Sequence, residues 1–359
     1  MNSIAGQIED EIRRRGPMSL ARFMELALYA PGLGYYERQR EIGRRGDFFT
    51  SVSVGSLFGE LLAFQFAQWW DSENTSGDLQ IIEAGAHEGR LAGDMLDWFQ
   101  RWRPDLFARL DFCLIEPSPL HREWQTQNLA PWLSKVKWRS HLSELASGKA
   151  SRIVFCNELL DAMPVHRLTW NAAKREWREC RVACTGQGFA WQVMEMAGSP
   201  PNVDLELAAI LPEGFIIEYS PMAIAWWKQA AETLGHGKLL TIDYGLTSDE
   251  RFSPERRDGA LRAFAAHHLV NDPLENPGEC DITSHIDFSA IEQAGHSAGL
   301  RTEAFITQAK FLTQILAQTQ AVPGHFAAWT PARVKQFQTL THPEHLGRAF
   351  RALVQSRAG

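Results

Sequence analysis

Four short apolar segments, each flanked by sequence of helical character, constrain the fold of this 359-residue chain more than any other feature. They are LQIIEAG at 79–85, FCLIEPS at 112–118, RIVFCNE at 152–158 and KLLTIDYG at 238–245. Short, continuous apolar runs are typical of strands buried on both faces, as in a parallel sheet covered by helices. The sequence therefore predicts an α/β protein with a mostly parallel sheet flanked by helices.

Helical periodicity accounts for much of the remaining chain. It predicts helices over 3–15, 18–28, 56–70, 121–130 and 221–235, and one from about residue 91. The last segment, roughly 311–358, is also expected to be helical, with proline breaks.

Two regions interrupt the alternation of strands and helices. Residues 165–196 alternate at period two, with turn signals at NAAK and TGQG, which predicts inserted antiparallel strands. Residues 251–288 are expected to be a loop-rich excursion with one strand near its start. We therefore divide the chain into an N-terminal helical cap with a substrate and cofactor loop (1–75), a core with both insertions (76–310) and a C-terminal helical segment (311–359).

Composition excludes several classes of function. The net charge of −7 provides no general attraction to nucleic acid or to a membrane surface. No apolar run approaches membrane-spanning length, and the first residues resemble neither a secretory signal nor a transit peptide. Five scattered cysteines fit a reducing compartment, and Cys180 and Cys184 lack the further ligands of a structural zinc site. We expect a cytoplasmic protein without a metal, bound to no nucleic acid and not inserted in a membrane.

The carboxyl ends of the four predicted strands carry polar residues. Ligands of open α/β sheets bind at this edge, where the strand order reverses. In EAGAHEG, Gly85 and Gly89 would let the backbone approach a ligand closely, although the same spacing is typical of ordinary strand-to-helix turns. Glu116, at the end of the second strand, is suited to accept hydrogen bonds from ribose hydroxyls.

Longer motifs, in the same order over nearly the whole chain, resemble one family. They are GPMSLARFMELALYAPGLGYY, GDFFTS with LFGE, NELLDAMPVHR, IDYG, RAFAAHHLVNDPLENPGECDITSHIDFSAI and LTHPEHLGRAF. Together they resemble the MidA-type family, which includes the mitochondrial assembly-factor methyltransferase of respiratory complex I. The resemblance implies a class I, Rossmann-like methyltransferase fold and S-adenosyl-L-methionine as the cofactor. The implied cofactor-binding residues are Gly46, Asp47, Thr50, Glu83, Gly85, His87, Gly89, Glu116 and Asn157.

The chain departs from the family pattern beside the expected cofactor site. The family loop E-x-G-P-G-x-G becomes EAGAHEG, so that His87 replaces the middle glycine, and T-S-P-E becomes TSVS. If the middle position requires a positive φ, a histidine there costs roughly 1 kcal/mol or more. The imidazole could fill cofactor space or point to solvent, so both an active and a closed site are compatible with the sequence.

The resemblance implies methyl transfer to an arginine of a protein, with a complex I subunit as the family's type of target. A guanidinium is protonated at physiological pH, so the site needs carboxylates to orient it and to accept a proton. We expect Glu158 to orient the acceptor, with Asp161 second and His267 as a proton relay. Asp161 could instead serve a helix N-terminus, and Asp47 could be an ordinary turn residue.

Three other functions compete with this one. The altered cofactor segments are compatible with a degenerate, non-catalytic assembly factor. A class I methyltransferase for a small molecule would have an enclosed pocket without a protein-sized groove. A dehydrogenase is disfavoured because no full G-x-G-x-x-G is present. The sequence leaves a homodimer open.

Overall fold

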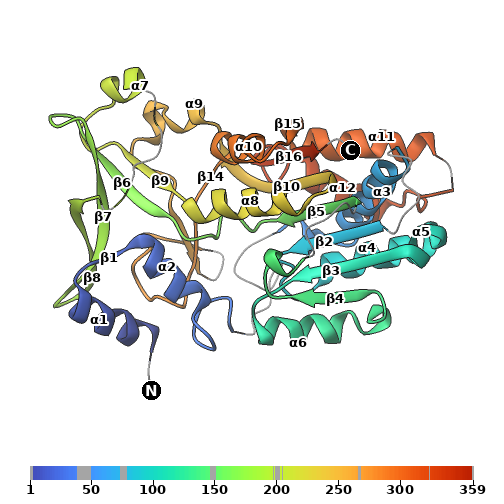
Figure 1. Cartoon of the computed structure of the whole chain (residues 1–359), viewed down its shortest axis with the longest axis horizontal. Helices are drawn as coiled ribbons and strands as arrows, with labels where there is room; N and C mark the ends of the chain where they lie inside the picture. Colours follow the sequence, from blue (N-terminus) through green and yellow to red (C-terminus); the bar gives the residue numbers. More distant parts are fainter. Residues whose placement is uncertain are drawn as a thin grey trace.

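The computed structural model describes residues 3–38, 50–72, 79–145, 151–196, 198, 203, 205–265, 268–322 and 324–357. Figure 1 shows a core sheet with its helices on one side of the molecule and the N-terminal helices beside a second sheet on the other. No helix in these ranges is both long enough and apolar enough to cross a membrane.

The core sheet has the strand order β15-β16-β10-β5-β2-β3-β4. Its strands are β2 (Leu79–Ala84), β3 (Leu110–Ile115), β4 (Val136–Arg139), β5 (Ser151–Asn157), β10 (His236–Leu246), β15 (Arg301–Thr307) and β16 (Phe350–Arg357). The strands from β4 to β10 pair in parallel, and β16 is antiparallel to both its neighbours. A short strand, β14 (Ile286–Asp287), extends β10 in parallel. The predicted mostly parallel α/β sheet is confirmed.

Helices cover both faces of this sheet. Successive residues of β2, such as Ile81 and Ile82, belong to different apolar clusters because side chains of a strand alternate between faces. One cluster includes residues of α3 (Leu57–Ser72), α4 (Arg90–Trp102), α5 (Pro104–Arg109), α11 (Gln308–Ala321) and α12 (Pro331–Thr341). The other includes residues of α8 (Pro221–Thr233) and α10 (Phe288–Ser297). Helix α6 (Pro119–Asn128) lies near α4.

The second sheet is antiparallel and has the order β1-β7-β6-β9, with β8 paired to β7. It contains β1 (Met18–Ser19), β6 (His166–Asn171), β7 (Glu176–Thr185), β8 (Gly188–Glu195) and β9 (Ile216–Tyr219). Helices α1 (Ile4–Arg15) and α2 (Leu20–Tyr29) share an apolar cluster with this sheet, in which Ile8 and Phe23 join Val182. The predicted antiparallel insertion is therefore present, and it supports the N-terminal helices (Figure 1).

The excursion contains more strands than expected. A sheet with the order β12-β11-β13 is formed by β11 (Arg262–Ala265), β12 (His268–Val270) and β13 (Asp281–Thr283). Such short strands have too few residues for a period of two to be visible in sequence. The remaining short helices are η1 (Val52–Val54), η2 (Ala130–Trp132), η3 (Leu142–Glu144), α7 (Leu205–Ile210), α9 (Ser248–Arg251) and η4 (Pro254–Arg256).

The expectation of a helical C-terminal segment was wrong for its last part. Residues Phe350–Arg357 form β16, which is buried along most of its length between β10 and β15. Its sequence, FRALVQSR, contains several good helix formers, so local propensity favours a helix. Hydrogen bonding to a strand on each side overrides that propensity, and this context is invisible in the local sequence.

Candidate active site

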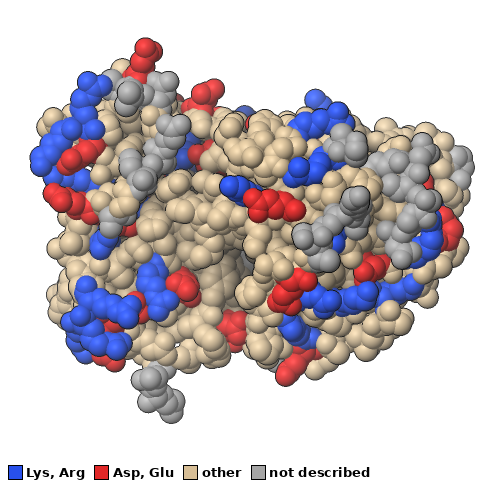
Figure 2. All heavy atoms as spheres, viewed as in Figure 1, with Lys and Arg blue, Asp and Glu red and all other residues tan. Residues whose placement is uncertain are grey.

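A cavity of about 1610 Å³ lies at the carboxyl ends of β2 and β5. The strand order reverses here, because β3 and β4 follow on one side of β2 while β5 and β10 follow on the other. Open α/β sheets bind ligands at such a point. The space exceeds the roughly 300–1,000 Å³ of common small-molecule sites, which leaves room for two ligands. The surface in Figure 2 is hollowed near its centre.

The loop after β2 has three residues with left-handed backbone. They are Gly85 with φ +76°, His87 with φ +47° and Gly89 with φ +84°. A Cβ at Gly85 would lie 3.0 Å from Cδ1 of Leu159, and one at Gly89 would lie 3.2 Å from Cδ1 of Leu129. Both glycines are therefore required by conformation as well as by space.

His87 adopts a positive φ of +47°, a conformation that the sequence had left open. Its ring packs against His121 and Trp124, with ring centroids 5.3 and 5.7 Å apart, and its carbonyl oxygen accepts a 2.8 Å hydrogen bond from Gln125. Burial lowers the pKa of His87 to about 3, so the imidazole is neutral. The side chain thus packs against α6 while it lines the cavity wall.

Replacing His87 with glycine tests whether this residue limits cofactor binding. We expect His87→Gly to bind S-adenosylhomocysteine with equal or up to about fivefold higher affinity, because glycine adopts the same positive φ without strain and frees the cavity space that the imidazole lines. Arg175→Gly is the matched control, since Arg175 has φ +53° in the turn between β6 and β7. It should leave the affinity unchanged in calorimetric titration. A clear loss of affinity in His87→Gly would instead identify His87 as a ligand-binding residue.

Glu83 precedes the glycine loop and is 2% exposed. Its Oε2 atom has no hydrogen-bond partner among the described residues. Burial, followed by the charge of Asp94, raises the pKa of Glu83 to about 8. An unpartnered buried carboxyl oxygen of this kind suits a cationic donor, such as the amino group of S-adenosylmethionine. The residues present therefore fit the expected cofactor.

The raised pKa of Glu83 predicts that cofactor binding is linked to proton release. Glu83 is protonated below about pH 8 in the free protein, whereas a bound ammonium group favours its ionised form. Affinity for S-adenosylhomocysteine should therefore rise between pH 6 and 7.5, by at most about tenfold per pH unit. Calorimetry at pH 7 in phosphate and in Tris should show a buffer-dependent heat of binding, which Glu83→Gln removes. Equal heats in the two buffers for the unmodified protein would contradict this linkage.

Glu116 is held by three donors at the end of β3. Its Oε1 accepts from the amide of Ser118 at 2.9 Å, and its Oε2 accepts from Nε2 of Gln125 at 2.9 Å. Nδ1 of His121 lies 3.3 Å from the same Oε2. A carboxylate has about four lone-pair sites, so this fixed group can accept one further hydrogen bond. Ribose binding by Glu116 stays a prediction.

Glu158 follows β5 in a strained conformation, with φ +52°. Its Oε1 accepts hydrogen bonds from the amide of Ser51 at 3.1 Å and from Nδ2 of Asn157 at 3.0 Å. Burial raises the pKa of Glu158 to about 8. Oδ1 of Asn157 has no partner among the described residues. A non-glycine residue held at positive φ is a feature of functional sites.

Asp161 lies in the turn after β5 and not at a helix N-terminus, so the alternative role in a helix dipole does not apply. It is 5% exposed, and its Oδ1 has no hydrogen-bond partner in the described part of the chain. Burial raises its pKa to about 6. The buried carboxylate of Asp243 holds this turn, since its Oδ2 accepts from the amide of Leu160 at 3.0 Å.

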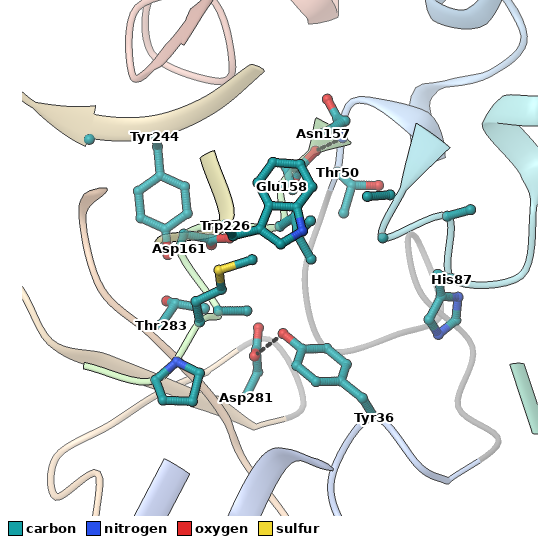
Figure 3. A pocket seen from close by; sticks show the side chains of 18 of the residues that line it. Tyr36, Thr50, His87, Asn157, Glu158, Asp161, Trp226, Tyr244, Asp281 and Thr283 are labelled. Carbon is teal, nitrogen blue, oxygen red and sulfur yellow. Dashed lines mark hydrogen bonds between the residues drawn. The ribbon is translucent and has the colours of Figure 1, made fainter. Parts of the chain in front are cut away.

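The excursion brings further polar residues to the same cavity. In Figure 3, Tyr244, Asp161 and Thr283 lie together at one side, His87 lies at the other, and Glu158, Asp281 and Tyr36 lie between them. Oγ1 of Thr283 also lacks a partner among the described residues. Sequence analysis did not identify Tyr36, Asp281 or Thr283 as site residues. All three lie in segments that match the family, which was the only signal available.

Of the remaining site residues predicted from the sequence, one lines the cavity and three lie outside the described residues. Thr50 is buried and lines the cavity, and its hydroxyl accepts a 3.1 Å hydrogen bond from the amide of Ser53. Gly46, Asp47 and His267 lie outside the described residues. Another histidine of the same excursion, His285, lines the cavity, and burial lowers the pKa of its imidazole to about 4. No group of three or more potential metal ligands occurs among the residues that the structure describes.

Curated relatives are similar to this chain over most of its length. A Drosophila melanogaster protein named protein arginine methyltransferase NDUFAF7 homolog, mitochondrial, is 25% identical, covering 98% of this chain and 84% of that relative. The Xenopus tropicalis protein arginine methyltransferase NDUFAF7, mitochondrial, is 28% identical, covering 87% and 75%. These names contradict the cytoplasmic location predicted from the sequence, because they place the relatives in mitochondria.

Two solved structures are also similar to this chain over nearly its whole length. A Burkholderia thailandensis protein, whose crystal structure contains bound S-adenosylhomocysteine, superimposes with a TM-score of 0.84 and 29% identity, covering 99% of this chain and 92% of that chain. A native crystal structure of a protein from the same organism gives a TM-score of 0.80 at 28% identity. The model of a family described as S-adenosyl-L-methionine-dependent methyltransferase matches residues 61–306, more than half of the sequence. The chain therefore belongs to this family of methyltransferases, with S-adenosylmethionine as its cofactor.

Proposed function

We propose that the protein methylates an arginine side chain of a protein. The observation that carries this proposal is that three residues lining one cavity, Asn157, Asp161 and Thr283, each have a buried acceptor atom without a partner among the described residues. Buried polar atoms without partners are rare, and these need a ligand that donates several hydrogen bonds. A guanidinium has five N–H donors and no acceptor, which matches this requirement.

The charge of the cavity supports a cationic acceptor. Ten acidic residues and five arginines line it, and no lysine lines it among the described residues. A cleft with excess charge of one sign attracts ligands of the opposite sign. The acceptor side chain is therefore expected to be positively charged when it enters.

Cofactor binding is assigned to residues around the glycine loop. Glu83 would hold the amino group, Gly85 and Gly89 would allow close approach of the backbone, and Glu116 would accept from the ribose. Asn157, at the end of β5, and Thr50 complete this proposed set. His87 would line it, and Gly46 and Asp47 remain predictions from the family pattern.

Glu158 and Asp161 would orient the guanidinium and accept the proton that it releases. When bound, the cofactor would supply a sulfonium methyl group to the acceptor nitrogen, with cleavage of its S–C bond and S-adenosylhomocysteine as the leaving group. The nitrogen gives up one N–H proton as the new N–C bond forms, so the methylated guanidinium keeps a single positive charge. Burial raises the pKa of Glu158 to about 8 in the free protein, and a bound guanidinium would favour the ionised form of its carboxyl group, which can then receive that proton. His267 could then relay it to solvent.

The direct experiment uses labelled cofactor and identified products. The purified protein is incubated with methyl-labelled S-adenosylmethionine and arginine-containing peptides, including peptides from respiratory complex I subunits, which the family resemblance makes the first candidates. Mass spectrometry should locate the added methyl on an arginine side chain. Label on lysine, histidine or a small molecule, with none on arginine, would overturn the proposal.

A further inference from the structure

Tyr36 is held by partners on two sides of the cavity. Its main-chain oxygen lies 2.7 Å from Nε2 of His121, on α6 beside the glycine loop. Its hydroxyl donates to Oδ1 of Asp281, at the start of β13, at 2.6 Å. One residue therefore joins the cofactor side of the cavity to the acceptor side (Figure 3).

The turn after α2 fixes the position of Tyr36. The amide of Tyr36 donates to the carbonyl oxygen of Leu28 at 3.0 Å, and its ring stacks on Tyr29 with centroids 5.4 Å apart. A Cβ at Gly34 would lie 2.6 Å from the main chain of Leu28, so only glycine allows the chain to fold back this closely. The motif APGLGYY thus ends the helix and directs the Tyr36 hydroxyl toward Asp281.

The bonds of His121 indicate that its imidazole is charged. Nε2 faces the carbonyl oxygen of Tyr36, and Nδ1 faces Oε2 of Glu116. Both partners are acceptors, so the two contacts are both hydrogen bonds only in the charged imidazole, in which both ring nitrogens carry hydrogen. Burial lowers the pKa of His121, but the hydrogen bond to Glu116 and its charge, with a smaller contribution from Glu37, outweigh burial and raise it. Neighbouring His87 is neutral, so it does not oppose this charge.

We propose that Tyr36 is a positioning residue that transmits cofactor binding at Glu116 to the acceptor chamber at Asp281. The inference rests on the proposed function for the identity of the two subsites. A ligand on Glu116 restrains His121, which holds the main chain of Tyr36, and the Tyr36 hydroxyl then restrains Asp281. Loss of motion at one site can lower the entropic cost of ordering another without a large displacement.

Hydrogen exchange tests this coupling without an acceptor. S-adenosylhomocysteine should slow amide exchange in residues 281–287 of the unmodified protein by roughly tenfold, within the usual range of coupling between sites. In Tyr36→Phe this slowing should disappear, while the dissociation constant for S-adenosylhomocysteine stays within about twofold, because the His121 contact uses the main chain. Tyr29→Phe is the matched control. It removes a hydroxyl bonded to the Ala162 carbonyl in the same ring stack and should keep the effect.

A second variant, at His121, tests the same coupling from the cofactor side of the cavity. His121→Phe keeps the stacking on Trp124 but removes both hydrogen bonds. It should weaken S-adenosylhomocysteine binding roughly tenfold and also abolish the slowing at 281–287. The inference is overturned if the ligand leaves exchange at 281–287 unchanged in the unmodified protein, or if Tyr36→Phe retains the full effect.

A further titration distinguishes failure of the proposed role of Tyr36 from failure of the proposed arginine methylation. Ethylguanidine, with butylamine as an ammonium control, is titrated into the protein saturated with S-adenosylhomocysteine. Binding of ethylguanidine together with full coupling in Tyr36→Phe would refute only the role of Tyr36. Coupling that depends on Tyr36, without preference for ethylguanidine, would support that role and refute the guanidinium acceptor.

Discussion

Replacing Glu158 with glutamine is expected to reduce methyl transfer by roughly 10²- to 10⁴-fold, the usual contribution of a positioned proton acceptor. Glutamine retains an oxygen that can accept from Ser51 and Asn157, so the strained loop keeps its hydrogen bonds. The substitution removes the proton-accepting group and the negative charge that a bound guanidinium would favour on Glu158. Affinity for S-adenosylhomocysteine should remain within about twofold, because the change alters only the acceptor side.

Two measurements separate this effect from misfolding. Initial rates with labelled cofactor report transfer, and calorimetry with S-adenosylhomocysteine reports the cofactor site. Glu232→Gln, at an exposed position of α8, removes an equal charge outside the cavity and should retain full activity. A Glu158→Gln protein with near-normal transfer would show that Glu158 has no catalytic role.

Replacing Gly85 with valine is expected to weaken cofactor binding by more than about 100-fold. A β-branched residue is a severe outlier at positive φ, with a strain of roughly 1–3 kcal/mol. The new Cβ would also lie 3.0 Å from Leu159, and the added methyl groups would enter the cavity lined by the loop. Circular dichroism should still show a folded protein, since the rest of the sheet is unaffected.

Gly214→Val is a matched control for backbone strain. Gly214 has the same φ of +76°, and a Cβ there would meet no atom within 4 Å. It lies in the turn before β9, outside the cavity lining. Both variants should lower the midpoint of thermal unfolding, but only Gly85→Val should lose binding of S-adenosylhomocysteine. Unchanged affinity in Gly85→Val would refute the assignment of this loop to the cofactor.

Much of the core could be predicted because its signals are local. Continuous apolar runs identified β2, β3, β5 and β10, each within a few residues of its observed bounds. Strands β4 and β9 were missed because four residues carry little periodic signal. Strand β16 was mistaken for a helix because its residues favour helix, while its partners β10 and β15 are distant in sequence.

The residues of the site likewise divide into those that the sequence predicted and those that only the tertiary structure brought together. The sequence by itself determined that Gly85, Glu116 and Glu158 meet at one edge, because parallel strands align their carboxyl ends. It also located the glycine loop, whereas the left-handed backbone of that loop came from the structure. Only the tertiary structure brought Tyr36 to Asp281, across 245 residues of chain. No local propensity encodes such a contact, since it forms when the N-terminal turn and the excursion pack against the same cavity.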